Sequence, residues 1–470
     1  MRSALLSALL LTGCVAVPTP PPAPPVLAPP VTGVDREHEQ LVASFGGEYR
    51  APRTQALLEE ITGRLVAATE RPEKRYRITI LDSPAVNAFA LPTGRLYVTR
   101  GLIALANDTS ELAAVMAHEI AHVTLRHAAA RTELEARSAL VTRVVSDVLR
   151  DQSASARIRD ASRYEFARFS RAQELEADAV SVRTLDRAGF DPFGATRFLT
   201  ALEAFGNLQA ALPGAERQPT SLDRLATHPA TTERIVEARA AARRIGAPGL
   251  REGDRERFLA AIDGIAFGDD PRDGLVVGNS YVNARLAIAF SAPPGFTLDN
   301  SSRAVLGASA DGARRLMFDA VEASPGRSLE DVVRATWTDD IETRDVAPRR
   351  VNGLDAAVGT SIGRDWHFRV AAIRAPSGTY RLIVAHRPGD GGASAAFEET
   401  LASVRNVPQA ELAALPRLRV RIVTAQAGDT VETLGRRMRT ANPVETFRVL
   451  NGLFDTARVE PGRSYKIVAP

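Results

Sequence analysis

The chain has 470 residues, of which 45% are hydrophobic and 24% charged, a composition that excludes a largely disordered protein. This length predicts about two to four domains, and the formal net charge of +3 excludes nucleic-acid binding driven by charge alone. The single cysteine excludes an intramolecular disulfide and metal sites built from several cysteines. A bound metal must therefore use histidine and carboxylate ligands.

The N-terminus has the pattern of an export and anchoring signal. Arg2 is followed by an apolar run from Ser3 to Thr12, too short to span a bilayer, and then by Cys14. The residues LTGC resemble the lipobox of bacterial lipoproteins, and this resemblance implies cleavage before Cys14 and lipidation of its sulfur. The alternative is an ordinary signal peptide with an incidental cysteine.

Residues 1–13 are thus interpreted as a signal peptide, and residues 14–34 as a tether. Eight prolines between residues 17 and 31 make this tether stiff. Val15 stands where an aspartate would suggest retention at the inner membrane. We therefore expect the chain to be anchored to the outer membrane through lipidated Cys14 and to face the periplasm.

Residues 35–245 have mostly helical periodicity. Alternating apolar residues within 76–81 and 88–99 predict two strands, with a turn at 92–94 just before the second. The predicted fold class is α+β, with a mostly helical first domain around a small β-sheet that has an exposed edge.

The second half of the chain changes character. Residues 246–274 are interpreted as a linker and residues 417–470 as a small terminal module. Between them, residues 275–408 alternate in short runs separated by turns, which predicts a strand-rich α+β domain with a sheet covered on one face. Helices are expected in that domain near 329–337 and 394–404, and its role is not indicated by any motif.

One stretch carries the pattern of a catalytic metal site. Asp108 followed by Glu111 is an N-terminal capping box and predicts that a helix begins there. His118 and His122 are four residues apart and share one face of this helix, so both imidazoles can bind one metal ion. Glu119 lies about 100° round the helix, close enough to take a proton from a metal-bound water. The alternative is a pair of buried histidines without a metal.

A third ligand is expected on a second helix. Glu174 and Asp178 share a face there, and on spacing alone either could bind the metal while the other accepts a hydrogen bond from a ligand imidazole. Glu176 points to the opposite side and is expected to be solvated. His127 is also expected on the solvent side, because it lies about 180° round the first helix from His118.

Together these residues resemble the HtpX-like and CAAX-prenyl-protease-like zinc metallopeptidases. The resemblance rests on HEIAH, on SRAQELEADAV some fifty residues later, on VNAFALPTGRLYVTRGLI (86–103) and on THPATTERI (227–235). It covers residues 35–245. Thr93 stands where the family usually has a glycine, and Leu96 where it has an isoleucine.

The resemblance implies one Zn²⁺ per chain. Its ligands would be His118, His122 and Glu174, with Asp178 supporting a ligand imidazole from behind. The resemblance also implies that extended substrate pairs with an exposed edge strand, formed by Asn87, Ala88 and Phe89.

The same resemblance assigns catalytic roles to His228 and Arg234. Pro229 suits the first turn of a helix, so His228 is expected at a helix N-terminus and Arg234 about one and a half turns later. Both could then donate hydrogen bonds to the oxyanion of the scissile carbonyl. The alternative is a helix cap and a surface arginine.

The terminal module resembles a LysM domain, a small βααβ fold that binds cell-wall glycans. This resemblance implies peptidoglycan as a partner. The matching residues are Gly428, Asp429, Thr430, Leu434, Asn451, Leu453, Pro461, Gly462 and the strand Tyr465–Val468.

The function predicted from these features is that of a membrane-anchored zinc metalloendopeptidase of the bacterial envelope. Its substrates would be polypeptides, namely damaged or misassembled envelope proteins, and Glu119 would activate the water that hydrolyses the peptide bond. The alternative is a chaperone or cell-wall adaptor built on a peptidase fold. A purely structural lipoprotein, the third possibility, would bind no metal.

Overall fold

A computed structural model describes residues 33–134, 152–211, 228, 230–249, 254–300, 304–321, 326–336, 341–454 and 457–470. The predicted signal peptide, Cys14 and all but the last two residues of the predicted tether lie outside the described residues. Within the described ranges, no helix combines the length and apolar character that crossing a bilayer requires.

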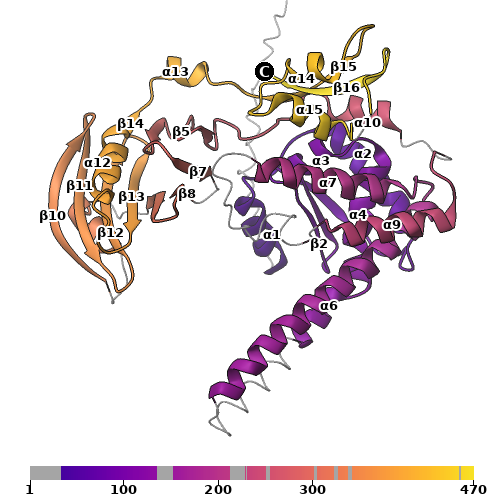
Figure 1. Cartoon of the computed structure of the whole chain (residues 1–470), viewed down its shortest axis with the longest axis horizontal. Coiled ribbons are helices and arrows are strands. Elements are labelled where there is room, and N and C mark those ends of the chain that lie inside the picture. Colours follow the sequence, from indigo (N-terminus) through magenta and orange to yellow (C-terminus); the bar gives the residue numbers. More distant parts are fainter. Residues whose placement is uncertain are drawn as a thin grey trace, which may run out of the picture.

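The first body of the structure is helical and surrounds a small three-stranded sheet (Figure 1). Its sheet has the order β1-β3-β2, with β1 parallel and β2 antiparallel to the central strand. The elements are α1 (Gly33–Ser44), α2 (Pro52–Ala67), β1 (Arg77–Leu81), β2 (Ala88–Leu91), β3 (Arg95–Thr99), α3 (Arg100–Leu105), α4 (Thr109–Thr124), α6 (Gln152–Arg187), α7 (Gly194–Ala210), α9 (Thr232–Ile245) and α10 (Arg255–Ile262).

The segment expected to contain two strands contains three. Gly94, at a φ of 85°, lies in the turn that folds β2 back onto β3, and its amide donates to the carbonyl of Leu91 at 3.0 Å. A side chain is disfavoured at such a positive φ, which is why glycine suits this turn. As a result β2, which contains Ala88 and Phe89, lies at the edge of the sheet.

Helix α4 lies at the centre of this body and is buried on all sides from Thr109 to Ala121. Its start is the predicted one: the side chain of Asp108 accepts a hydrogen bond from the amide of Glu111 at 2.8 Å. The Glu111 carboxylate accepts from the amide of Asn107, also at 2.8 Å. The amides of Glu111 and Asn107 are thus satisfied inside the protein.

Residues 275–406 form a separate strand-rich body, seen in orange in Figure 1. Its sheets have the orders β10-β11-β12-β13-β9-β8-β7 and β14-β6-β5-β4. The strands are β4 (Leu275–Val277), β5 (Ser280–Asn283), β6 (Ile288–Ser291), β7 (Phe296–Asn300), β8 (Ala304–Ser309), β9 (Arg314–Val321), β10 (Glu342–Val351), β11 (Leu354–Ile362), β12 (His367–Ala375), β13 (Gly378–His386) and β14 (Arg405–Asn406).

The larger sheet is covered by a helix on each face, and not on one face as expected. Successive residues of a strand point to opposite faces. Ala371 of β12 packs in one apolar cluster with Phe397 of α12 (Ala393–Ser403), and its neighbour Ala372 packs in another with Val333 of α11 (Leu329–Arg334).

The chain then returns through α13 (Gln409–Ala413) to the first body and completes it. The terminal module has the predicted βααβ order: β15 (Arg419–Thr424), α14 (Val431–Gly435), α15 (Pro443–Leu450) and β16 (Ser464–Ala469), with the two strands antiparallel. Phe447 and Leu450 of α15 belong to the same buried cluster as Leu102 and Leu202 of the first body. The strand-rich body is therefore an insertion between α10 and β15.

The range 246–274, expected to be a linker, contains α10 and a segment that pairs with the terminal module. Backbone hydrogen bonds join Gly264 to Val420 at 2.8 Å, Val420 to Ile265 at 2.9 Å and Phe267 to Leu418 at 2.9 Å. The two polypeptide segments that lead to and from the inserted body are thus paired with each other.

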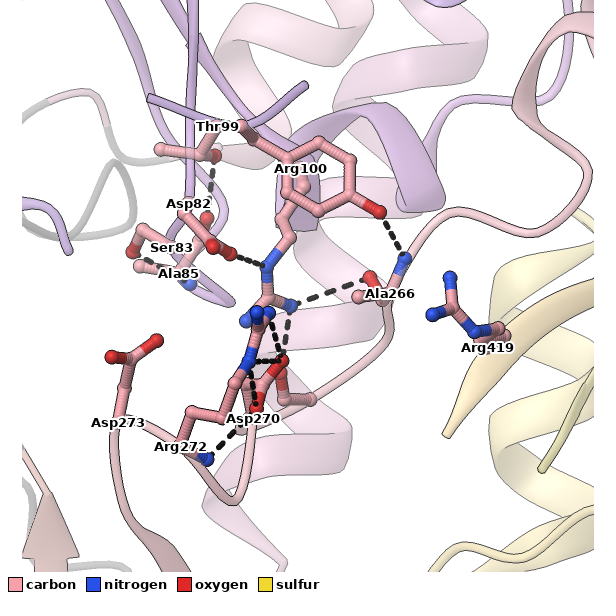
Figure 2. Close-up of polar contacts among 12 residues, drawn as sticks. Asp82, Ser83, Ala85, Thr99, Arg100, Ala266, Asp270, Arg272, Asp273 and Arg419 are labelled. Atoms are coloured by element: carbon pink, nitrogen blue, oxygen red, sulfur yellow. Dashed lines mark hydrogen bonds and ion pairs between the residues drawn. The ribbon is translucent and has the colours of Figure 1, made fainter. Parts of the chain in front are cut away.

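A buried arginine holds the outgoing segment against the small sheet (Figure 2). Arg100 is only 1% exposed. Its Nε donates to Asp82 at 2.6 Å, and its Nη1 donates to the carbonyls of Gly268 at 2.7 Å and Ala266 at 3.3 Å. Because one of these partners is the carboxylate of Asp82, the buried charge is compensated.

A buried lysine joins the terminal module to the start of α4. Lys466 of β16 has no exposed surface, and burial lowers its pKa well below the usual value. Its Nζ donates to the carbonyls of Ala104, Leu105 and Ala106 at 2.8, 3.1 and 2.5 Å. These carbonyls are at the end of α3, directly before the cap of α4.

We expect Lys466→Met to destabilise the first body, and not only the terminal module. Methionine has a similar volume but cannot donate, so buried carbonyls lose their partner and the free energy of unfolding should fall by about 2 kcal/mol or more. Urea denaturation followed by circular dichroism measures this change.

Lys74→Met is the matched control, because Lys74 is the chain's other lysine and is partly exposed. It should cost no more than about 0.5 kcal/mol. Equal unfolding midpoints for the two variants would contradict the role given to Lys466.

Candidate metal centre

Three parts of the first body bring potential metal ligands together. His118 and His122 lie on α4, Glu174 lies on α6, and His228 lies in the segment before α9. One ligand atom from each of these four residues lies within 4.8 Å of the others. The Nε2 atoms of His118 and His122, one helical turn apart, are separated by 3.0 Å.

Glu174 is the carboxylate that faces both imidazoles. Its Oε2 lies 3.3 Å from Nε2 of His118, and its Oε1 lies 3.4 Å from Nε2 of His122. The side chain of Glu176 is 59% exposed and lies on the other side of α6, as the helical spacing predicts.

Asp178 supports His118 from behind. Its Oδ1 lies 2.9 Å from Nδ1 of His118, the ring nitrogen that faces away from the cluster. Arg234 in turn holds Asp178, with Nε and Nη2 donating to the two carboxylate oxygens at 2.7 and 2.8 Å. The Nη1 of Arg234 also lies 3.0 Å from Oε2 of Glu174.

Arg234 is therefore neither a surface residue nor placed as the sequence predicted. Helix α9 begins at Thr232 and not near Pro229, because the hydroxyl of Thr231 accepts a hydrogen bond from the amide of Arg234 and caps the helix. Arg234 is thus in the first turn and is 2% exposed. Its guanidinium contacts the carboxylates of Glu174 and Asp178, so it orients these two groups.

His228 lies before the helix and not at its N-terminus. Its Nδ1 lies 2.9 Å and 3.0 Å from the two oxygens of Glu174. Its ring packs edge-on against the rings of His118 and His122, at centroid distances of 5.5 and 5.0 Å. The structure therefore places His228 among the potential ligands, where it can contact either a metal ion or a substrate.

The expectation that His127 faces solvent is wrong. Its Nδ1 lies 2.9 Å from Nδ1 of His122, and the residue is 5% exposed. The helical extrapolation fails because α4 ends at Thr124, and Arg126 turns the chain with a φ of 57°. No glycine or proline marks this helix end, so the sequence offered no local signal for it.

The surroundings keep the cluster's carboxylates ionised. Burial alone would raise the pKa of Glu174, but hydrogen bonds with His118 and His228 hold that pKa well below its usual range. Burial likewise opposes ionisation of Asp178, and the hydrogen bonds from Arg234 together with the charge of His118 lower its pKa. Negative charge is therefore available at the point where the imidazoles converge.

The imidazoles titrate in opposite directions. Burial and the neighbouring charge of His118 lower the pKa of His122, which keeps its ring neutral. Burial also opposes protonation of His118, but Asp178 and Glu174 outweigh it and raise the His118 pKa. A metal ion competes with that proton, since only the neutral ring can be a ligand. Two imidazoles and an ionised carboxylate form the donor set of a catalytic zinc site.

The predicted substrate strand lies next to α4. Asn87 is buried, and its amide donates to the hydroxyl of Thr99 at 3.0 Å. Phe89 stacks on Tyr97 with ring centroids 4.8 Å apart, which anchors β2 to the rest of the sheet. The outer edge of β2 is the end of the sheet among the described strands.

The comparison with known proteins agrees with this geometry. Residues 52–242 match the sequence profile of Peptidase family M48. Over these residues, called the M48 domain, the chain is similar to the M48 peptidases. The domain holds the HEIAH helix and every residue of the cluster. The narrower resemblance to HtpX-like and CAAX-prenyl-protease-like enzymes remains a prediction, and so does the LysM assignment.

Two curated proteins are similar to part of this chain. The beta-barrel assembly-enhancing protease of Escherichia coli is 28% identical over 221 residues, which are 45% of this chain and 43% of the relative. The mitochondrial metalloendopeptidase OMA1 of Schizosaccharomyces pombe is 28% identical over 179 residues, 37% of this chain and 51% of the relative. The chain thus spans about half the length of the relatives it matches.

Among solved structures, cyanobacterial PsbP from Synechocystis aligns with 30% of this chain and 98% of its own, at 12% identity and a TM-score of 0.22. A similarity this weak assigns no fold or function to any part of the chain.

We expect Arg234→Met to destabilise the metal-free M48 domain strongly. The substitution leaves the buried carboxylates of Glu174 and Asp178 without their guanidinium, so the free energy of unfolding should fall by about 3–5 kcal/mol. Thermal and urea denaturation in a chelator give this value.

Arg239→Met provides the comparison, because Arg239 lies on the same helix and is exposed. Its effect should stay within about 0.5 kcal/mol. If both variants unfold like the parent protein, Arg234 does not hold the two carboxylates.

Proposed function

We propose that this protein is a zinc metalloendopeptidase of the bacterial envelope. The observation that carries the proposal is the convergence of His118, His122 and Glu174 within the residues that match Peptidase family M48, with Glu119 on the same helix as the two imidazoles. The name of the Escherichia coli relative, which refers to assembly of β-barrel proteins, supports envelope proteins as the substrate class.

His118, His122 and Glu174 would hold the Zn²⁺. When bound, the ion supplies Lewis-acid polarisation and lowers the pKa of water. Arg234 and Asp178 keep the ligands in place before the ion arrives, because their mutual hydrogen bonds are already made in the protein. Such support is typical of metal sites that hold their geometry during a reaction.

Glu119 serves as the general base. It is 3% exposed and directly follows His118 in the helix, so its carboxylate acts in a site with little competing solvent. It takes a proton from the attacking water and passes that proton to the leaving amine. The side chain is not one of the four in the ligand cluster, so its role is distinct from that of the ligands.

The oxyanion role remains with His228 in this proposal. Its imidazole lies beside the ligand atoms and comes from a segment outside the two ligand helices. Arg234, predicted to share that role, is assigned to positioning Glu174 and Asp178 instead. Substrate would pair in an extended conformation along β2, near Asn87, Ala88 and Phe89.

The rival function is that of a chaperone or cell-wall adaptor on a peptidase fold. Casein cleavage that stops when a chelator is added separates the two, because an adaptor would not hydrolyse peptide bonds. Peptidoglycan binding by residues 417–470 remains a prediction that fits either function. The module shares its core with the M48 domain, so such binding is best examined on the whole chain.

We expect Glu119→Gln to retain one zinc per chain and to lose casein cleavage by about a thousandfold or more. Glutamine keeps the size of the side chain but cannot accept the proton from water. Metal analysis and a fluorescent casein assay measure the two properties separately.

His118→Ala serves as the contrasting variant, since it should lose both zinc and activity. A Glu119→Gln protein that binds zinc and still cleaves casein at nearly the parental rate would show that Glu119 is not the base.

Membrane anchoring through Cys14 is the second part of the proposal. Cys14→Ser removes the lipid acceptor, and no described helix can span a bilayer, so the variant should leave the membrane fraction or remain uncleaved. Cell fractionation with a high-salt wash tests this. A variant that still sediments with outer membranes would refute the lipobox interpretation.

A further inference from the structure

Each histidine on α4 has a partner at its outer ring nitrogen, and the two partners differ. Asp178 lies at Nδ1 of His118, whereas another histidine, His127, lies at Nδ1 of His122 at 2.9 Å. The series of side-chain contacts continues towards the surface, because Nε2 of His127 lies 3.4 Å from Oε2 of Glu176. The sequence had left both His127 and Glu176 without a role.

The backbone fixes His127 in this position. After α4 ends at Thr124, Arg126 adopts a left-handed backbone conformation that interrupts the helix. The carbonyl of His127 then accepts a hydrogen bond from Nε2 of Gln173 at 3.0 Å. Gln173 lies on α6, next to Glu174, and is 3% exposed. His127 is thus held from α6 as well as from its own chain.

We propose that His127 and Glu176 are positioning residues that orient His122 as a zinc ligand. The inference rests on the proposed zinc site and adds to it a chain of contacts, Glu176–His127–His122, that ends at the exposed side of α6.

Hydrogen-bond valence allows one arrangement of protons along this chain. A neutral imidazole carries one proton, so a ring that gives its Nε2 lone pair to a metal must hold its proton at Nδ1. His122 therefore donates from Nδ1 to Nδ1 of His127. Neutral His127 then has its own proton at Nε2, where it faces the carboxylate of Glu176.

This arrangement resembles the carboxylate–histidine–metal pattern that sets ring orientation in many metal sites, with a second imidazole placed between. The intermediate ring is needed because Glu176 lies on the face of α6 opposite Glu174 and Asp178. His127 spans that distance from the end of α4. His118 needs no such ring, since Asp178 shares the face of Glu174.

The test measures zinc affinity of the full chain by competition with a chromogenic chelator. We expect His127→Ala to weaken zinc binding by about 10–100-fold. His127→Asn should restore most of the affinity, because the asparagine amide can place an acceptor oxygen close to where Nδ1 stood. Glu176→Gln should weaken binding less than His127→Ala does.

Two controls separate positioning from a merely structural role. Glu237→Gln, at an exposed site on α9, should leave zinc affinity unchanged. In the metal-free state, His127→Ala and His127→Asn should unfold at similar temperatures, whereas only the cobalt-loaded form of His127→Ala should show a shifted visible absorption spectrum.

The inference is overturned if His127→Ala binds zinc as tightly as the parent protein, or if its only effect is a lower unfolding temperature without metal. Failure of the proposed function would look different: the parent protein itself would then bind no zinc.

Discussion

The burial of α4 is the constraint on which the rest of the structure depends. A helix that is buried from Thr109 to Ala121 and carries His118 and Glu119 has no solvent to satisfy its polar groups. Unpaired charges in such a place would cost several kcal/mol each, on the order of the whole stability of a domain. Glu174 and Asp178 of α6 lie beside His118 and supply the partners that solvent cannot, and the site is a consequence of this pairing.

The need to pair the polar groups at the start of α4 brings distant parts of the chain together there. The cap of α4 is reached by Arg197 of α7, whose Nη2 lies 2.9 Å from Asp108, and by Arg255 of α10, whose Nη1 donates to the carbonyl of Asn107 at 2.9 Å. Lys466 of β16 donates to the carbonyl of Ala104, at the end of α3 and just before this cap. The described residues between 275 and 408 make none of these contacts, so this body can be inserted between α10 and β15. The paired segments 264–267 and 418–420 carry the chain out of the first body and back.

The ligand cluster is held in place by two kinds of contact, ion pairs and contacts between imidazoles. Arg234 orients Glu174 and Asp178 at once, so one guanidinium sets the position of two carboxylates. His122, at the more exposed end of the cluster, is supported by His127 instead. Glu174 and Asp178 are thus held by ion pairs with Arg234. His122 is held by a neutral imidazole, which requires no compensating charge.

The sequence by itself determined the features that depend on spacing within one helix. The start of α4, the shared face of His118 and His122, and the inward face of Glu174 all follow from a period of 3.6 residues, which holds as long as the helix continues. Only the tertiary structure decided where that period stops: His127 becomes buried because α4 ends before it, and Arg234 joins the cluster because α9 starts later than Pro229 suggests. The contacts of Lys466 could not be predicted from the sequence either. More than three hundred residues separate Lys466 from α3, and no local pattern encodes such a pairing.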